Sequence, residues 1–426
     1  MKKYFNRALG LATSATARDT YVLFTGNIVS AFLGFVFTLF AARALSVSDF
    51  GVLSAAINLI IIISSLTDLG ISSGLVNFVS VSLSHKDQKK ADEYSKAALA
   101  FKLVVSLPLI LFVVFFAGFV AQKWLATGDK TISYWVAGIS LVAIFWGVLP
   151  YILQAEKKFL KSVLIDISLS FPKAVIPYAF LLFGLLNLQT ALLSFAVGAG
   201  IAGVTGFVFV GTKFLKAKPG KNIYLDLIKF SGWLGVNRII SSISGKLDIQ
   251  MLAAIAGATA AGLYSIPAKL ASFIVVLASS FSAVLAPRLA SFGNKDNERR
   301  YLIKATLVLI PMVVGVIIWI IIAKPFIVFL FGIKYLPSVP VFQALAASMI
   351  PFLLSVPSVS AIIYSMKKTV FIGLFSFFQL ASIFALNYIF IPRIGPFGPT
   401  IAFGVVNSIL AIYTWAIIIK HYWFEK

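Results

Sequence analysis

Long apolar runs alternate along this chain with short segments that carry most of its charge. An α-helix rises about 1.5 Å per residue, so about 20 apolar residues cross a hydrocarbon core about 30 Å thick. The runs lack the alternation of a lipid-facing strand, which favours helices over a barrel. The pattern therefore predicts about twelve transmembrane helices. They are expected near residues 21–44, 51–82, 97–121, 132–153, 162–184, 187–212, 227–256, 259–287, 301–323, 339–364, 369–391 and 398–419.

The run at 51–82 is too long for one straight crossing and contains Asp68-Leu69-Gly70, so we predict that this helix breaks there. Composition supports the membrane assignment. Of 426 residues, 60% are hydrophobic and 12% are charged, against roughly 45–50% and 25% in soluble domains. The sequence thus predicts an all-α polytopic membrane protein. The positively charged N-terminus lacks a compact apolar segment followed by a cleavage site, so we expect no cleaved signal peptide.

Basic residues are concentrated in alternate loops, which explains the formal net charge of +22. About 23 Lys and Arg lie on the side that holds both termini and about 5 on the other. Short cytoplasmic loops carry such an excess of Lys and Arg, so we expect both termini in the cytoplasm. We expect the protein itself in the inner (cytoplasmic) membrane. The cations are scattered over short loops rather than gathered on one face, which excludes nucleic acid as a partner.

No soluble catalytic domain fits between the helices. The longest loops, near 83–96, 213–226 and 288–300, hold about 15 residues each, far fewer than the roughly 50 of a small domain. The chain has 2 His and no Cys, so it offers little material for a metal centre or a catalytic triad. The glycines of 198–203 match a nucleotide-binding pattern but lie inside an apolar run, where small residues let helices approach closely. We expect no enzyme, catalytic residue, metal or cofactor.

The sequence contains an internal repeat. Ala44–Ser54 aligns with Ile255–Ser265, pairing Gly51 with Gly262, and Lys86-Asp87 aligns with Lys295-Asp296 at nearly the same offset. The repeat predicts two six-helix bundles, at 1–213 and 227–426, joined by a cytoplasmic linker at 214–226. Because each half has an even number of crossings, the repeat is parallel, and such halves enclose a central cavity and alternate access by rocking.

Charges inside the apolar runs are the candidate functional residues, because a charge facing lipid costs about 2.5–3.5 kcal/mol or more. On a continuous helix over 227–256, Arg238 shares a polar face with Ser241 and Ser242, flanked by Lys246 and Asp248. Cations outnumber anions in these runs, which favours an anionic substrate such as a phosphate or diphosphate. The candidate cavity cations are Arg238, Lys246, Lys269, Arg43 and Lys173, and the candidate ion-coupling carboxylates are Asp248, Asp68 and Asp166.

Each candidate has a structural alternative. Lys102, Lys229 and Lys304 lie near cytoplasmic helix ends, where we expect them to reach the headgroups, and Arg43 either does the same outward or lines the cavity. Asp68 either couples an ion or caps the helix that resumes at Leu69. Asp248 and Asp166 either couple an ion or serve as counter-ions for neighbouring cations.

Three stretches carry a resemblance to a known family. RALSVSDFGVLSAAINLIIIISSLTDLGISSGLVNF, from Arg43 to Phe78, resembles the early region of the polysaccharide-unit flippases, the O-antigen and capsule branch of the multidrug/oligosaccharidyl-lipid/polysaccharide (MOP) exporter superfamily. DIQMLAAIAGATAAGLYSIPAKL, from Asp248 to Leu270, and FSAVLAPRLASF, from Phe281 to Phe292, are similar to the second-half signature. The resemblance covers essentially the whole chain.

The resemblance implies that the protein moves an oligosaccharide linked to an isoprenoid (undecaprenyl) diphosphate from the cytoplasmic to the outer leaflet. It implies coupling to protons or sodium, and polysaccharide polymerases and glycosyltransferases as partners. The family's basic cavity residues correspond by region to Arg238, Lys246 and Lys269. A multidrug and toxin exporter of the same superfamily is the alternative, although its usual cationic drugs favour an acidic or aromatic cavity.

Overall fold

The computed structural model describes residues 15–292 and 294–424, with all side chains in these ranges except those of residues 15–17, 233, 234, 236–238 and 241. In this part of the chain the regular elements are all helical, which confirms the predicted all-α class. Ten of the described helices are long and apolar enough to cross a membrane. They coincide with ten of the twelve predicted spans. The other two, near 162–184 and 227–256, contain helices that also carry several charges.

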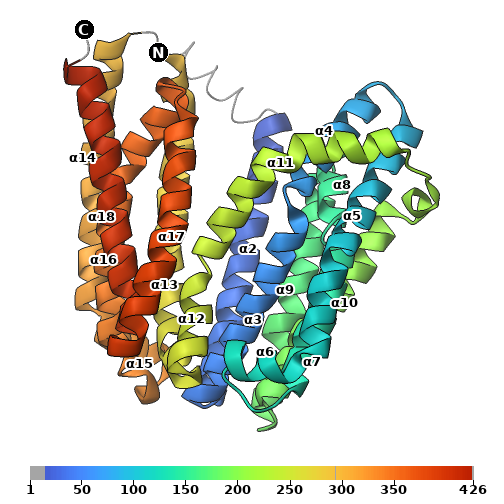
Figure 1. Ribbon diagram of the computed structural model, residues 1–426, viewed down its shortest axis with the longest axis horizontal. Helices are drawn as coiled ribbons and strands as arrows, with labels where there is room; N and C mark the ends of the chain where they lie inside the picture. The colour runs from blue at the N-terminus through green and yellow to red at the C-terminus, as the bar shows by residue number, and fades with distance from the viewer. Residues whose placement is uncertain (1–14, 293, 425–426) are drawn as a thin grey trace. The chain divides into compact units, whose positions relative to one another are not determined.

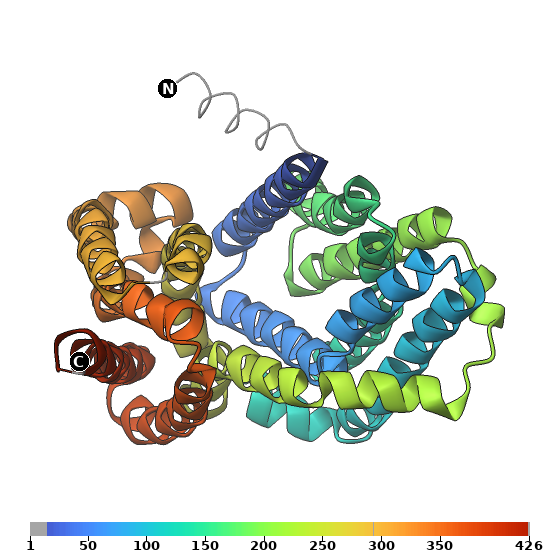
Figure 2. The same cartoon turned by 90° about the horizontal axis from the view of Figure 1, so that it is seen from above.

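The chain forms two compact units (Figures 1 and 2). The first comprises residues up to Leu45, Leu59–Ala121 and Gly128–Ile239. Its elements are α2 (Ala15–Ala44), the second half of α3 (Val47–Asp68), α4 (Ile71–Ser84), α5 (Gln88–Phe115), most of α6 (Ala117–Trp124), α7 (Thr131–Trp146), α8 (Leu149–Ala155), α9 (Phe159–Leu182), α10 (Leu188–Val210), η1 (Lys213–Lys216) and most of α11 (Lys221–Ser244).

The second unit comprises Ser46–Asn58, Gln122–Thr127 and the residues from Ile240 onward, so two short segments group with the C-terminal part of the chain. Its elements are the first half of α3 with α12 (Leu247–Ala256), α13 (Ala258–Ser291), α14 (Lys295–Ile321), α15 (Ala323–Phe331), η2 (Ile333–Tyr335), α16 (Ser338–Ser360), η3 (Ala361–Ser365), α17 (Thr369–Ile394), α18 (Phe397–Ile419) and η4 (Lys420–Phe424).

The break predicted near Asp68-Leu69-Gly70 is confirmed. Helix α3 ends at Asp68 and α4 begins at Ile71, with Leu69 at φ 42° and Gly70 at φ 76°. Glycine adopts this left-handed conformation without steric cost, so the sequence permits a sharp turn at this position. The alternative that Asp68 caps the following helix is wrong, because Gly70 occupies the N-cap of α4 and no side chain caps it.

The prediction of one continuous helix over 227–256 is wrong. Helix α11 ends at Ser244 and α12 begins at Leu247. At the break, the Lys246 amide donates to the Ile243 carbonyl at 2.9 Å, a tighter turn than the α-helical pattern. The polar face calculated for a straight helix therefore does not continue from Arg238 to Lys246 and Asp248.

The part of α11 that belongs to the first unit packs against its other helices. Its first part runs crosswise to α5 and α10 in Figure 1 and is seen at nearly full length in Figure 2. Glycines allow the close approach, because a Cβ on Gly235 would overlap the Leu69 carbonyl and a Cβ on Gly70 would lie 2.9 Å from the Gly235 nitrogen. The Tyr94 hydroxyl on α5 donates to Asp226 of α11 at 2.9 Å. This helix is thus held by both backbone contact and a hydrogen bond.

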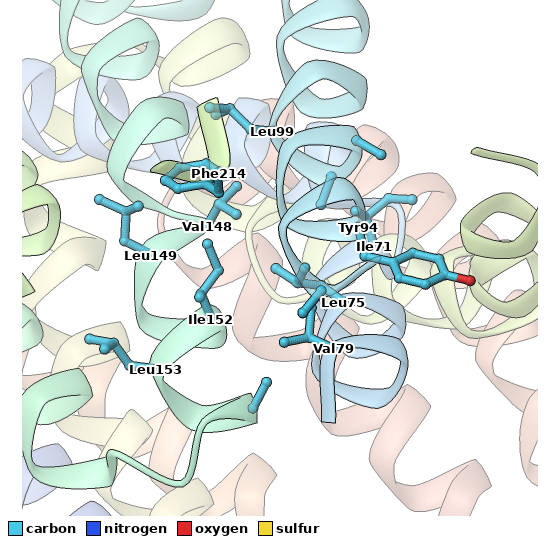
Figure 3. Packing of buried hydrophobic residues seen from close by; sticks show 14 of the residues in the cluster. Ile71, Leu75, Val79, Tyr94, Leu99, Val148, Leu149, Ile152, Leu153 and Phe214 are labelled. Carbon is cyan, nitrogen blue, oxygen red and sulfur yellow. The ribbon is translucent and has the colours of Figure 1, made fainter. Parts of the chain in front are cut away.

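The core of the first unit lies where α4, α5 and α8 meet (Figure 3). Ile71, Leu75, Leu149 and Leu153 are fully buried there, and the Phe78 and Tyr94 rings stack with centroids 4.9 Å apart. In a bilayer, close packing of this kind, rather than escape from water, stabilises helix association.

Backbone contact also joins α3 to α13 within the second unit. A Cβ on Gly51 would overlap the Ala258 carbonyl, and a Cβ on Gly262 would overlap the Val47 carbonyl. Gly51 and Gly262 are the two glycines that the internal repeat pairs with each other. Equivalent positions of the repeat therefore meet face to face, which only residues without a side chain permit.

Candidate functional site

The first unit holds a buried polar cluster at the α3–α4 break, formed by Asp68, Ser72 and Lys102 and here called the Asp68 cluster. The Lys102 ammonium lies 2.7 Å from the Asp68 carboxylate and donates to the Ser72 hydroxyl at 2.8 Å. The Ser72 hydroxyl in turn donates to Asp68. The side chains of Lys102 and Asp68 are 7% and 18% exposed. The break in the helix thus brings a carboxylate from α3 and a hydroxyl from α4 onto one lysine of α5.

Lys102 does not reach the headgroups, so that interpretation is wrong. Its ammonium is buried on Asp68 and lies 5.6 Å from the centroid of the Tyr151 ring. An ion pair offsets the desolvation of both charges when they are held this closely. Lys229 and Lys304 are exposed on α11 and α14, which fits their predicted position at the headgroups.

Lys173 and Asp166 lie on α9 in the same unit. The Lys173 ammonium is packed over the Phe195 ring, 3.6 Å from its centroid, and the residue is 9% exposed. Gly198 leaves room for this lysine, because a Cβ there would lie 3.3 Å from its Cγ. The half-buried Asp166 is within electrostatic range of Lys173. This lysine therefore has an aromatic and an acidic neighbour inside the unit.

Two further predicted cavity cations are Arg43 and Arg238. Arg43 is exposed in the last turn of α2. Arg238 lies in the helical backbone of α11, and its side chain is outside the described residues. The role predicted for each stays a prediction.

Three of the predicted residues fall in one part of the second unit: Lys246 lies within electrostatic range of both Asp248 and Lys269, and Tyr264 lies beside Asp248. We call these four residues the Asp248 cluster. Asp248 is 5% exposed and accepts a hydrogen bond from the Ile249 amide at 2.8 Å. The fully buried Tyr264 hydroxyl lies beside this carboxylate, yet it has no hydrogen bond of normal geometry within the described part of the chain. Lys246 interacts electrostatically with both Asp248 and Lys269, and both lysines are half-buried.

The helix break that positions Lys246 is held by side chains from elsewhere in the second unit. The Asn58 amide of α3 donates to the Lys246 carbonyl at 2.7 Å. The Gln250 amide of α12 lies 3.4 Å from Asn58 and donates to the Trp124 carbonyl at 2.5 Å. Asn58 therefore ties α3 to the backbone at the helix break.

Sequence reasoning missed Tyr264 and Asn58, and it assigned Lys102 to the headgroups. Asn58 was detectable, because it is a lone amide in the apolar stretch SAAINLIIII. The roles of Lys102 and Tyr264 depend on neighbours that only the fold brings close. Net charge distinguishes the two clusters: the Asp68 cluster contains one lysine and one carboxylate, whereas the Asp248 cluster contains two lysines and one carboxylate.

A family model of polysaccharide biosynthesis proteins matches residues 16–293, which is more than half of the chain. The chain belongs to this family. Over 292 residues, this polysaccharide biosynthesis protein is 25% identical to the uncharacterized membrane protein EpsK of Bacillus subtilis (strain 168). The matched region covers 64% of this chain and 56% of that relative, so the chain spans little more than half of the relative's length.

Solved structures share the fold of this polysaccharide biosynthesis protein. An inward-facing multidrug resistance MATE family transporter of the MOP superfamily is 13% identical and matches with a TM-score of 0.75, over 91% of this chain and 93% of that one. The lipid II flippase MurJ, in an inward closed conformation, is 16% identical and also has a TM-score of 0.75, over 93% and 87% of the two chains. The architecture is therefore that of MOP superfamily transporters, and the protein is a multi-pass membrane protein.

Proposed function

We propose that this protein is a flippase that moves an oligosaccharide linked to an isoprenoid diphosphate from the cytoplasmic to the outer leaflet. One observation carries the proposal: in a member of a polysaccharide biosynthesis family, Lys246 and Lys269 lie within electrostatic range of each other inside a membrane helix bundle. Two like charges at this depth repel each other and lose hydration. An anionic ligand offsets both costs, and a diphosphate supplies the charge and the acceptor oxygens.

The proposed mechanism is alternating access. The sugar-diphosphate headgroup passes through a water-filled cavity lined by cations while the isoprenoid tail stays in the hydrocarbon core. Charged headgroups cannot cross hydrocarbon unaided at a useful rate, because an isolated ion in a low-dielectric medium costs tens of kcal/mol. Arg238, Arg43 and Lys173 are further candidates for contacts along this path. The three short stretches that resemble polysaccharide-unit flippases support this assignment over export of cationic drugs.

Asp248 is the proposed coupling carboxylate, binding a proton or a sodium ion. It is buried, and the adjacent Tyr264 hydroxyl offers a further oxygen. Asp68 is a weaker candidate because Lys102 and Ser72 already engage its carboxylate. Asp166 is only half-buried and lies near Lys173. Ion coupling requires a carboxylate that alternately binds and releases a proton or a sodium ion. A lysine that stays paired with the carboxylate opposes this exchange.

The loop charges support an orientation in which the protein lies in the inner membrane and both termini lie in the cytoplasm. In that orientation the substrate is assembled by glycosyltransferases on the inner side and consumed by a polysaccharide polymerase on the outer side. We propose these enzymes as the functional partners.

Flipping by the purified, reconstituted protein tests the proposal. The substrate is a fluorescent isoprenoid-diphosphate oligosaccharide, and an impermeant sugar-oxidising reagent reports the leaflet. Each charge-assisted hydrogen bond is worth about 1.5–3 kcal/mol, and about 1.4 kcal/mol is a tenfold change. Lys246→Gln combined with Lys269→Gln should therefore slow flipping at least about tenfold. Lys229→Gln removes one exposed lysine and is the matched control, with a rate close to that of the unchanged protein.

An unchanged rate in the double variant would refute the role of the two lysines. A protein that flips no diphosphate-linked sugar but lowers the accumulation of cationic drugs in cells would be a drug exporter instead. Coupling is tested separately: Asp248→Asn should make flipping insensitive to proton and sodium gradients, whereas retained sensitivity would exclude Asp248 as the coupling residue.

A further inference from the structure

The surface of the second unit carries an apolar groove to which the proposed transport path assigns no role. It has a volume of about 490 Å³ and lies between α14, α18 and η4. Its lining includes Ile303, Leu307, Trp415, Ile419, Trp423 and Phe424. Five of these six side chains are at least 39% exposed, so the groove opens outward. In a membrane, such a surface faces the acyl chains of lipids.

Hydrogen bonds hold residues in two walls of the groove. The Trp415 indole donates to the Leu354 carbonyl at 2.9 Å, which fixes this ring in place. The segment that carries Trp423 is clamped by its neighbour Tyr422, whose hydroxyl donates to the buried Glu298 carboxylate at 2.6 Å and lies 2.9 Å from the Ser365 hydroxyl. A preformed groove binds a flexible chain at a lower ordering cost than a mobile one.

Cations adjoin one end of the groove. The Arg299 guanidinium is stacked over the Trp423 ring, 4.3 Å from its centroid. Arg299, Ile303 and Leu307 follow one another at intervals of four along one ridge of α14, and Arg300 and Lys304 form the adjacent ridge. Arg300 and Lys304 are exposed. The α14 face therefore changes from basic to apolar within two turns.

Few acidic groups compete for these cations. Glu298 is buried and accepts from Tyr422, so it faces away from the groove lining. Asp296 is exposed one turn nearer the start of α14. Among the described residues, these three cations are set against one exposed carboxylate, which leaves a positive end, and guanidinium groups match phosphate oxygens in geometry. The charge pattern predicts that α14 starts on the cytoplasmic side, whose leaflet is rich in anionic lipids.

We infer that this groove binds an anionic phospholipid of the cytoplasmic leaflet, with the phosphate at Arg299, Arg300 and Lys304 and one acyl chain along Ile303, Leu307 and Trp415. The Trp423 ring sits at the boundary, where tryptophan is favoured in membrane proteins. The one hydroxyl in the groove lining, that of Thr306, already donates to the Leu302 carbonyl, so the lining presents an apolar surface to the chain.

Tryptophan quenching by brominated lipids tests the inference on the full-length protein in vesicles. Phosphatidylglycerol and phosphatidylcholine with identical brominated chains are compared at equal bromine content. Basic residues near a membrane surface favour anionic lipid, so quenching should show a preference for phosphatidylglycerol of about tenfold or more. Trp415→Phe should remove most of the lipid-selective quenching, because the proposed acyl chain, which carries the bromine, runs along this ring.

Charge variants separate a built site from general attraction. Arg299→Gln with Arg300→Gln should reduce the preference to near one, and Arg299→Lys should retain most of it. Lys367→Gln with Lys368→Gln removes the same charge from exposed residues of another loop and should leave the preference intact. Equal loss in both double variants would overturn the inference, as would no loss in either.

Two further experiments identify the molecule that the groove binds. Inorganic phosphate should not abolish the preference; if it does so alone, the cations bind a free anion and the lipid inference fails. Native mass spectrometry of the purified protein should show retained phosphatidylglycerol that the Arg299→Gln, Arg300→Gln variant loses. Selective retention of an isoprenyl phosphate at this groove instead would also overturn the inference. Thermal unfolding of each variant shows whether a lost signal reflects a lost fold.

Discussion

The buried ion pair between Lys102 and Asp68 gives the most informative prediction about this structure. Their charged atoms are 2.7 Å apart, which corresponds to an attraction of about 6 kcal/mol at an effective dielectric constant of about 20. Desolvation of the two charges cancels much of this attraction. Lys102→Met leaves the Asp68 carboxylate buried without its counter-ion, so we expect a loss of about 3–5 kcal/mol of unfolding free energy.

Asp68→Asn alone strands the ammonium of Lys102 and should cost a similar amount. The combination of both substitutions removes both charges, and the Ser72 hydroxyl can still donate to the side-chain oxygen of an asparagine at position 68. The double variant should therefore recover to within about 1 kcal/mol of the unchanged protein, because neutral replacement of a buried pair is often nearly neutral.

Thermal unfolding in detergent, followed by the fraction of protein that remains monodisperse, measures these differences. Lys158 and Glu156 provide the matched control, since their atoms are also 2.7 Å apart while their side chains are 50% and 20% exposed. Lys158→Met should change stability by no more than about 1 kcal/mol. Additive losses in the double variant, or a Lys102→Met protein as stable as the unchanged one, would refute the reasoning. Flipping by the double variant adds a functional readout, because retained coupling would confine Asp68 to a structural role.

Three further predictions follow from single positions. Gly51→Leu should prevent the close approach of α3 and α13 and lower the unfolding midpoint markedly, whereas Gly315→Ala, on α14 with open space around it, should raise stability by about 0.5–1 kcal/mol. Tyr422→Phe removes the donor to the buried Glu298 carboxylate and should cost about 1.5–3 kcal/mol; Tyr388→Phe, 66% exposed, should have no effect in the same unfolding assay. Asn387 is fully buried and neither of its amide atoms has a partner among the described residues, so Asn387→Leu should raise the unfolding midpoint, and a fall would show that a bound water satisfies the amide.

The helices and the break at Leu69-Gly70 could be predicted from the sequence, because both depend on local properties. Apolar length identifies a span, and Gly70 supplies a residue that accepts a left-handed turn. The second break, at Gly245-Lys246, has weaker local signals, since lysine is a good helix former. It is stabilised by Asn58, which lies 188 positions earlier in the chain. A partner that distant is invisible to any helical pattern.

The same reasoning explains why the candidate site was only partly predictable. Sequence placed Lys246, Asp248 and Lys269 among the candidates because charges are costly inside a membrane, and the fold does bring these three together. The sequence placed Lys102 at the headgroups because a lysine this close to a helix end can reach them. Tertiary structure decides instead that its ammonium pairs with Asp68.

The two clusters differ in a way that bears on transport. In the Asp68 cluster each charge has an opposite charge at contact distance, so the cluster is satisfied without a ligand. In the Asp248 cluster Lys246 interacts with the carboxylate and also with a second half-buried lysine, Lys269, and the neighbouring Tyr264 hydroxyl is buried without a hydrogen bond of normal geometry in the described structure. A cluster whose charges are already paired favours one conformation. A cluster with excess charge is stabilised when an anion or a coupling ion binds. A ligand shifts a conformational equilibrium only through such differential interactions. The Asp248 cluster is therefore the part of this structure best suited to couple binding to a change of state.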